Sequence, residues 1–281
     1  MNILYIVNAS GPDYLCDMIF HGLKQIKNAA VIDSKKLWYM YKLPFEIKTL
    51  LYGRGFTIYG NLDDDNADRN NIIEKIESCF FDFIFYGSVH RCLDYIDLVL
   101  KRYKKNKIIF IDGEDQTDIR YDLSAKGLYF KRELSSETEN VFPVQFSIPS
   151  EKIYKGECVK TKLYSDIIPG TKNNYVFYDE LSYYNEYRKS SIALTTKKAG
   201  WDCLRHYEII SNRCLPYFQD IENCPLQTLH NWPKNLLLKI NQLIKENRIS
   251  PAVISELSPE FFSITDTFTT ENSAKYILGK T

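Results

Sequence analysis

Apolar runs alternate with amphipathic stretches along the first half of this 281-residue chain. Short continuous apolar runs are typical of strands buried on both faces of a parallel sheet. Apolar positions spaced three and four residues apart are typical of helices that pack on such a sheet. The alternation predicts an α/β fold with a doubly wound parallel sheet. The pattern places strands at 2–7, 29–32, 56–59, 81–86 and 107–111, and helices at 15–26, 67–79 and 92–103.

The second half begins with a polar, turn-rich segment at 150–170, which we interpret as a linker. Residues 191–200 predict a short strand followed by a basic loop that ends in glycine. A helix at 201–212 and a strand at 214–218 follow, so the order of elements is that of a βαβ unit. The other expected elements are a short strand or turn at 175–178, helices at 180–189 and 234–246, and one more helix in a tail from 250.

The predicted helix at 201–212 carries a polar stripe formed by Asp202, Arg205, Glu208 and Asn212. The stripe starts in the first turn, where unpaired N–H groups and the positive end of the helix dipole favour phosphate. The guanidinium of Arg205 can hold a diphosphate, and the carboxylate of Glu208 can accept hydrogen bonds from a ribose diol. Equally, the stripe can be a solvated helix face with an Arg205–Glu208 ion pair.

Two runs within this unit, WDCLRHYE at 201–208 and NRCLP at 212–216, resemble the donor-site signature of GT-B glycosyltransferases. The similarity is greatest to the exostosin-like and spore-coat-maturation (CgeB-like) families, and it extends upstream to residues 183–194. In those families a Gly-rich loop precedes a helix with Arg-x-x-Glu, and a small residue or Cys, an apolar residue and Pro begin the next strand. The resemblance implies that Arg205 contacts the donor diphosphate and that Glu208 contacts the ribose.

The resemblance also implies two Rossmann-like domains with the donor-site cleft between them. Residues 1–150 would form the N-terminal, acceptor-side domain and residues 151–281 the C-terminal, donor-binding domain, with the tail packing back on the first. The implied activity is transfer of a sugar from a nucleotide-activated donor, UDP- or GDP-linked, to a hydroxyl of a glycan or other acceptor. Inversion, without a metal or other cofactor, is expected. The alternative is a non-catalytic protein of the same fold that binds nucleotide sugars or sugars.

The donor-binding candidates surround the first turn of the helix. Cations of the basic loop can balance the leaving diphosphate without a metal, and an aromatic ring can stack on or wall the nucleotide. These candidates are Lys197, Lys198, Gly200, Trp201, Asp202, Arg205, Glu208 and Tyr217.

Inversion requires a base that takes a proton from the acceptor hydroxyl, and a carboxylate or a histidine suits this role. In an open α/β sheet the loops at the carboxyl ends of the strands face the ligand cleft. The candidates in these loops are Asp115, Glu114, His90 and Asp13. We favour the first two, because they are the outermost acids of the acidic cluster at 112–115. The alternatives are a capping or core role for His90, a solvated turn for the acids and a first-turn helix position for Asp13.

Two other segments allow more than one interpretation. Residues 35–55 are irregular and aromatic, which favours a hydrophobic cover over the sheet and leaves an acceptor-side loop as the alternative. The adjacent cations Lys131 and Arg132 are typical of exposed surface side chains, and the alternative is that they face the donor phosphates across the cleft.

Composition excludes several classes of protein. The formal net charge is zero, whereas a broad nucleic-acid footprint needs a basic excess. The seven cysteines show no C-x-x-C spacing, which argues against a zinc site and a disulfide framework. The first residues predict a strand and not a signal peptide, and no apolar run is long enough for a transmembrane helix. We therefore expect a cytoplasmic protein, which could also lie peripherally on a membrane.

Overall fold

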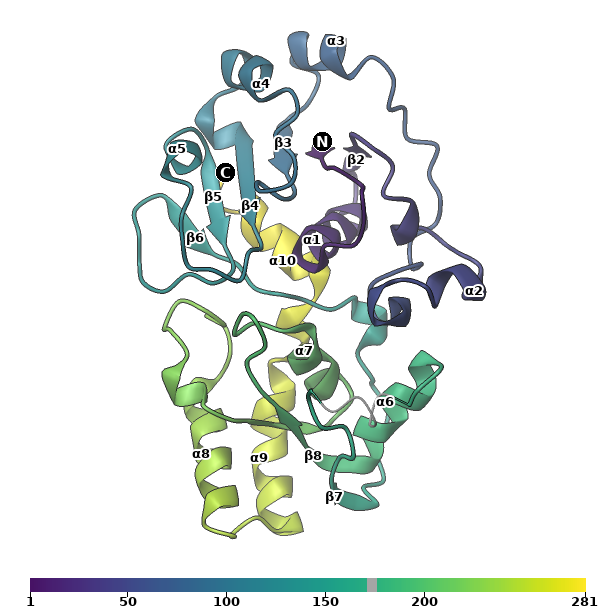
Figure 1. The fold of residues 1–281 in the computed structure, drawn as a ribbon, viewed down its shortest axis with the longest axis vertical. Coiled ribbons are helices and arrows are strands. Elements are labelled where there is room, and N and C mark those ends of the chain that lie inside the picture. The colour runs from purple at the N-terminus through teal and green to yellow at the C-terminus, as the bar shows by residue number, and fades with distance from the viewer. Residues whose placement is uncertain (171–175) are drawn as a thin grey trace.

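Two parallel β-sheets form the framework of the molecule in the computed structural model, which describes residues 1–170 and 176–281 (Figure 1). The strands are β1 (Asn2–Ile6), β2 (Ala30–Asp33), β3 (Phe83–Tyr86), β4 (Ile108–Asp112), β5 (Leu128–Lys131), β6 (Val141–Pro143), β7 (Lys162–Tyr164), β8 (Ser190–Thr195) and β9 (Leu215–Phe218). The first sheet has six strands in the order β2-β1-β3-β4-β5-β6, and the second has three in the order β7-β8-β9. All pairs between these strands are parallel, which confirms the predicted α/β class.

Helices connect the strands and cover the sheets. They are α1 (Tyr14–Gln25), α2 (Phe45–Lys48), α3 (Ile72–Glu77), α4 (Ile96–Arg102), α5 (Tyr121–Ser124), α6 (Glu180–Lys189), α7 (Leu204–Ser211), α8 (Lys234–Lys245), α9 (Pro251–Ser263) and α10 (Thr270–Leu278). Short 3₁₀ turns are η1 (Trp38–Met40), η2 (Tyr52–Gly55), η3 (Lys105–Lys107), η4 (Ser150–Lys152), η6 (Ile221–Asn223) and η7 (Thr265–Phe268). Within the described ranges, none of these helices has the length and apolarity needed to cross a bilayer.

Both faces of the first sheet are buried, which explains why its strands read as continuous apolar runs. Ile3 and Tyr5 point to the face that carries α1 and α10. Leu4 and Ile6 point to the other face, where they pack with residues of α3 and α4. Alternate residues of β1 therefore serve two separate cores, as the two-residue period of a strand requires.

The second sheet contains the predicted βαβ unit, because β8 and β9 are parallel neighbours joined through α7. Ile192 of β8 packs into a core shared with α8 and α9. Ala193 faces the opposite side, where it packs with tyrosines of α6. The loop between β8 and α7 lies at the carboxyl edge of this sheet, on the side of the first sheet (Figure 1).

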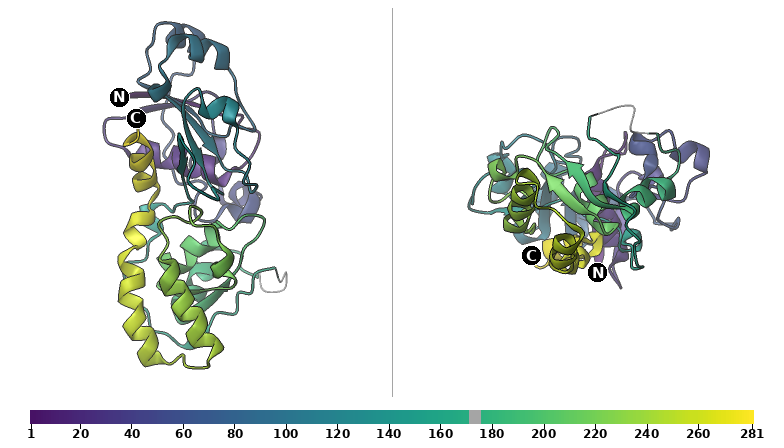
Figure 2. Two further views of the ribbon diagram at one scale, coloured as in Figure 1. Left: turned by 90° about the vertical axis from the view of Figure 1, so that its left-hand side faces the viewer. Right: turned by 90° about the horizontal axis from the view of Figure 1, so that it is seen from below.

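The chain passes between the two sheets twice, and the two passages lie side by side. The N–H of Ile148 donates to the carbonyl of Phe268 at 2.8 Å, and the N–H of Thr270 donates to the carbonyl of Ile148 at 3.0 Å. After the second passage, α10 packs on α1 of the first sheet, whereas α9 stays beside α8 (Figure 2). The position of Gly22 on α1 has no room for a Cβ, which would lie 1.9 Å from the carbonyl oxygen of Thr270.

The strand expected at 56–59 is wrong, because these residues form a turn after η2. Thr57 has φ 72° and Gly60 has φ 71°, both in the left-handed region that no strand uses. Ile58 and Tyr59 are nonetheless fully buried. Their apolar character serves a packed turn, which periodicity does not distinguish from a short strand.

Other boundaries also differ from the expectation. The segment at 150–170 contains the edge strand β7, which pairs with β8 although its polar residues gave no strand signal. The helix expected from 201 begins at Leu204, and the tail contains α9 and α10 where one helix was expected. Of the short strand or turn expected at 175–178, residue 175 lies outside the described residues, and no strand occurs at 176–178.

Candidate functional site

A cavity of about 560 Å³ lies between the loops at the carboxyl edges of the two sheets. The first half of the chain contributes the first residue of α1 and residues around η2, after β4, after β5 and after β6. The second half contributes Phe177, one residue of α6, the loop after β8 and the first turns of α7. The lining residues are Tyr14, Tyr52, Gly53, Arg54, Phe56, Asp115, Arg132, Phe146, Phe177, Tyr183, Lys198, Ala199, Gly200, Asp202, Cys203, Leu204, Arg205 and Glu208.

Two cations of the second half face this cavity, Lys198 and Arg205. The ammonium of Lys198 donates to the hydroxyl of Tyr52 at 2.7 Å, so the loop is tied to η2 of the other half. Burial lowers the pKa of the Arg205 guanidinium, while the nearby Glu208 carboxylate raises it. Lys197 is different: it lies outside the cavity lining and places its ammonium 5.1 Å from the ring centre of Trp201.

Glu208 lines the cavity but is only 6% exposed, so the solvated-face interpretation of this residue is wrong. The hydroxyl of Thr57 donates to Oε1 and that of Tyr183 donates to Oε2 at 2.6 Å. Burial raises the pKa of the Glu208 carboxyl, and the two hydroxyl groups oppose that rise. Both oxygens therefore already accept a protein hydroxyl, and each keeps a second lone pair for a ligand.

Asp202 does not lie on α7 but precedes it, and its side chain is 2% exposed. Its carboxylate accepts the N–H of Phe146 at 2.6 Å and the hydroxyl of Tyr207 at 2.9 Å. Phe146 belongs to the first passage between the sheets, so Asp202 joins the two halves of the chain. The arrangement supports a positioning role at the edge of the cavity more than direct contact with a ligand.

The two aromatic candidates, Trp201 and Tyr217, lie outside the cavity lining. Trp201 packs its ring beside that of Phe218, with 6.2 Å between the ring centroids. The backbone N–H of Trp201 donates to Glu133 Oε2 at 3.1 Å. Tyr217 is half-buried against the core of the second sheet. The rings that line the cavity come instead from Tyr14, Tyr52, Phe56, Phe146, Phe177 and Tyr183.

Arg132 is the main residue that sequence reasoning misjudged, because it is 2% exposed and not part of a surface pair. Its Nε donates to the carbonyl of Gly113 at 3.0 Å. Its Nη1 donates to Glu133 Oε1 at 2.7 Å and to the carbonyl of Asp202 at 2.6 Å. Its Nη2 donates to Asp115 Oδ1. The sequence could have indicated this position, because Arg132 directly follows β5 and therefore lies at the same sheet edge as Asp112 and Asp115.

Of the four candidate bases, all of which are described, Asp115 alone lines the cavity. Its side chain is 44% exposed and is held through Oδ1 by Arg132. Glu114 lies next to it, but its backbone N–H donates to Asp112 at 3.1 Å and its side chain is outside the lining.

The other two candidates have local partners outside the cavity. His90 places Nε2 3.3 Å from the buried carboxylate of Asp112. Asp13 caps α1 by accepting the N–H of Cys16 at 3.4 Å, and its carboxylate lies 3.3 Å from Nε of Arg91. Asp13 is therefore the N-cap of α1, one residue before the first turn in which it was expected.

Gly200 ends the basic loop at a point where a side chain has no room. A Cβ there would lie 2.5 Å from Glu133 Oε1, 2.7 Å from Arg132 Nη1 and 2.8 Å from Asp115 Oδ1. We expect Gly200→Ala to lower the free energy of unfolding by about 1–3 kcal/mol, the usual cost of overpacking. Urea unfolding would measure this, with Gly11→Ala as control because no atom lies within 4 Å of the corresponding Cβ. Equal stability of the two variants would contradict the prediction.

Asp202 predicts a pH dependence of stability. Burial raises the pKa of its carboxyl from 3.8 to about 7, although the Arg132 guanidinium and the N–H of Phe146 oppose the rise. The folded protein thus holds this proton more tightly than the unfolded chain. The resulting stability is fully present below about pH 3.8 and is lost as the pH rises through about 7.

Asp202→Asn should flatten this part of the stability curve, because an amide makes similar hydrogen bonds without titrating. The measurement is urea unfolding of both proteins at intervals between about pH 4 and pH 8. Parallel curves for the variant and the wild type would show that Asp202 does not titrate in this range.

Comparison with models of known protein families finds no match, and comparison with curated proteins finds none either. Among the residues that the structure describes, no group of three or more His, Cys, Asp or Glu side chains is arranged to hold a metal ion. The cysteines are all present as free thiols.

Proposed function

We propose that the protein is a glycosyltransferase of the GT-B type, with two Rossmann-like halves that bind a nucleotide-sugar donor and an acceptor in the cavity between them. The observation that carries this proposal is the composition of that cavity. Lys198, Gly200, Arg205 and Glu208 of the second half face it together with Asp115 of the first. Cations, a buried acid and a more exposed acid are the groups that donor binding and proton removal from an acceptor require.

The donor diphosphate would lie against Arg205, Lys198 and the first turn of α7. Cys203 at the N-cap makes no side-chain hydrogen bond to that turn, and Leu204 and Arg205 of the turn line the cavity. The ribose would bind the remaining lone pairs of Glu208. Rings such as those of Tyr14 and Phe146 offer apolar surface to a base or a sugar. This arrangement suits a UDP- or GDP-linked sugar.

Asp115 would act as the base that accepts the proton of the acceptor hydroxyl. Arg132 holds Oδ1 of this carboxylate. Oδ2 has no hydrogen-bond partner among the described residues, and the side chain is 44% exposed. Proton removal by Oδ2 as the hydroxyl attacks the anomeric carbon fits an inverting reaction, in which the nucleoside diphosphate leaves from the opposite face.

A second candidate function is non-catalytic binding of nucleotide sugars or sugars. It is favoured by the partners of the cavity's carboxylates, since Asp115, Asp202 and Glu208 each accept hydrogen bonds from other protein groups. Acids that accept hydrogen bonds from protein groups can hold a structure together without taking part in chemistry. Measuring binding and turnover on the same preparation separates the two functions.

The test combines thermal unfolding with a turnover assay. UDP- and GDP-sugars should raise the melting temperature in a saturable way, because a ligand of the folded state stabilises it. Release of the nucleoside diphosphate in the presence of acceptor sugars then reports catalysis. Binding without release would support the second function, and the absence of any stabilisation by the donors would refute both.

Arg205→Ala should weaken donor binding by about 10- to 150-fold, which corresponds to the loss of about 1.5–3 kcal/mol from a charge-assisted hydrogen bond. Titration calorimetry with the stabilising donor would measure it. Lys197→Ala is the matched control, because it removes a neighbouring cation that lies outside the cavity and should change affinity less than about twofold. Similar affinities for the two variants would argue against the donor site.

A further inference from the structure

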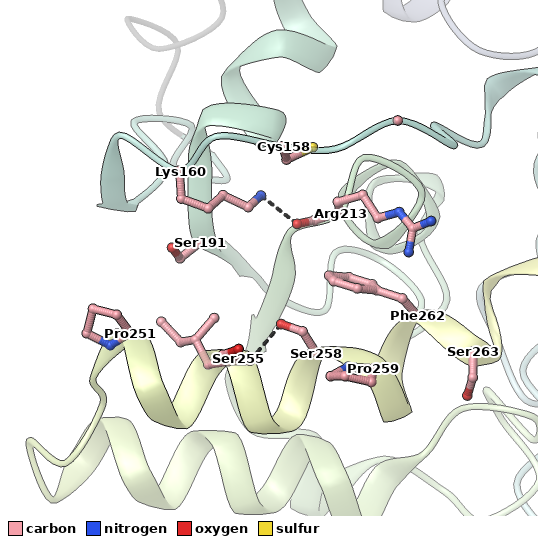
Figure 3. Close-up of a pocket in the computed structure, with 12 residues that line it drawn as sticks. Cys158, Lys160, Ser191, Arg213, Pro251, Ser255, Ser258, Pro259, Phe262 and Ser263 are labelled. Carbon is pink, nitrogen blue, oxygen red and sulfur yellow. Dashed lines mark hydrogen bonds between the residues drawn. The ribbon is translucent and has the colours of Figure 1, made fainter.

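A second cavity, of about 690 Å³, lies in the second half of the molecule on a different side from the first (Figure 3). It is bounded by α9, by the segment at 156–160, by the start of β8 and by Arg213 in the turn after α7. Because β8 enters here and its carboxyl end faces the first cavity, the two cavities lie at opposite ends of this strand. The lining residues are Gly156, Cys158, Lys160, Ser191, Arg213, Pro251, Ile254, Ser255, Ser258, Pro259, Phe262 and Ser263.

The charge on this second cavity is wholly positive. Lys160 and Arg213 line it, and no Asp or Glu is among the lining residues. The ammonium of Lys160 donates to the carbonyls of Ser190 at 2.7 Å and Arg213 at 2.5 Å, and to a third at 3.4 Å. Burial lowers the pKa of Lys160, and Arg213 lowers it further. Lys160 is thus balanced by backbone carbonyl dipoles, and its charge adds to that of Arg213 at this cavity.

The guanidinium of Arg213 is placed to receive an anion. Its Nε donates to the carbonyl of Tyr154 at 3.2 Å, and the group lies 5.3 Å from the ring centre of Phe262. These contacts fix the plane of the guanidinium. Among the described residues its two terminal nitrogens have no acceptor, so they can bind two oxygens of one phosphate. Figure 3 shows the guanidinium of Arg213 beside the ring of Phe262.

Hydroxyl groups line the cavity opposite the cations. Ser255 and Ser258 project from α9, and Ser191 lies at the start of β8 (Figure 3). Ser258 donates to the carbonyl of Ile254 at 2.7 Å. In the described part of the chain the hydroxyls of Ser255 and Ser191 make no such bond, so both can donate to a ligand. The carboxylates of the same helix, Glu256 and Glu260, lie outside the lining.

We infer that this second cavity binds a phosphate-bearing ligand, with its phosphate on Arg213, its remaining polar groups on the serine hydroxyls and its apolar part against Phe262 and Pro259. A cavity with two cations, available hydroxyl donors and no carboxylate selects an anion. The guanidinium fork matches phosphate, and the rings and Ile254 provide apolar contact for the rest of the ligand. The inference does not depend on the function proposed for the first cavity.

The test uses inorganic pyrophosphate as the probe and the full chain as the protein. Ser255→Glu places a carboxylate in the second cavity at an exposed helix position, where the fold is not at risk. Ala252→Glu places the same charge on α9 outside that cavity. Titration calorimetry should show that Ser255→Glu weakens binding about tenfold or more, whereas Ala252→Glu changes it less than about twofold.

The same titration distinguishes the two cavities. Arg205→Ala should weaken only the binding of pyrophosphate in the first cavity. A pyrophosphate site that is lost in Ser255→Glu but kept in Arg205→Ala therefore belongs to the second cavity, even if the proposed function fails. Absence of such a site in the wild type, or equal effects of the two glutamate substitutions, would overturn the inference. Sedimentation with vesicles that contain phosphatidic acid identifies the source of the phosphate. Co-sedimentation lost in Ser255→Glu indicates a lipid headgroup, and pyrophosphate binding without co-sedimentation indicates a free phosphate compound.

Discussion

Arg132→Ala is expected to lower the free energy of unfolding by about 3–5 kcal/mol, the usual cost of removing one partner from a buried ion pair. The guanidinium is 2% exposed and connects Gly113, Asp115, Glu133 and the carbonyl of Asp202. Alanine would leave the carboxylate of Glu133, which is equally buried, without its cation. Such an uncompensated charge is costly because the surrounding protein solvates it poorly.

Arg120→Ala provides the control for this measurement. Arg120 pairs with Asp122 at 2.7 Å, but the two side chains are 36% and 55% exposed, so the loss should be at most about 1 kcal/mol. Chemical unfolding of both variants at neutral pH gives the comparison. If Arg132→Ala is no less stable than Arg120→Ala, the buried network does not hold the two halves of the chain together.

Asp115→Asn is expected to reduce kcat by about 100- to 10,000-fold while leaving donor affinity within a few fold of the wild type, as removal of a general base does. The asparagine oxygen can still accept the hydrogen bond from Arg132, so the loop should keep its place. The readout is release of nucleoside diphosphate in the presence of the acceptor.

Glu114→Gln is the matched control, because it neutralises the adjacent carboxylate that lies outside the cavity lining. It should retain kcat within a few fold. Loss of activity in Glu114→Gln together with normal activity in Asp115→Asn would identify Glu114 as the base. Full activity in both variants would show that neither Asp115 nor Glu114 is the base.

Local pattern was sufficient for most of the secondary structure. The helix α6 and the strand β8 were expected almost to the residue, because a polar helix gives way there to a continuous apolar run. The positions of Arg205 and Glu208 beside the cavity also followed from local reasoning, since the loop before α7 must lie at the carboxyl edge of a parallel sheet. Their roles in binding a donor remain part of the proposal.

Contacts between distant parts of the chain could not be predicted in this way. Thr57 reaches Glu208 across 151 positions, and nothing in the local sequence of either residue indicates the other. Arg132 and Asp202 are joined across 70 positions. Because of such distant contacts, Arg132 lies at the centre of a buried network, although its local sequence predicted a surface side chain. Trp201 and Tyr217 were misplaced for another reason: an aromatic ring satisfies a core and a ligand site equally well.

The paired passages at Ile148 and Thr269 join the two halves of the molecule through two adjacent chain segments. Two chain segments that hydrogen-bond to each other resist twisting and sliding better than one segment does, yet they can still bend together. Rotation of one half against the other about this double connection would widen or narrow the space next to Arg205. The two halves are also joined by the bond from Thr57 to Glu208, by that from Lys198 to Tyr52 and by the Arg132 network, so such a rotation would have to break these contacts as well.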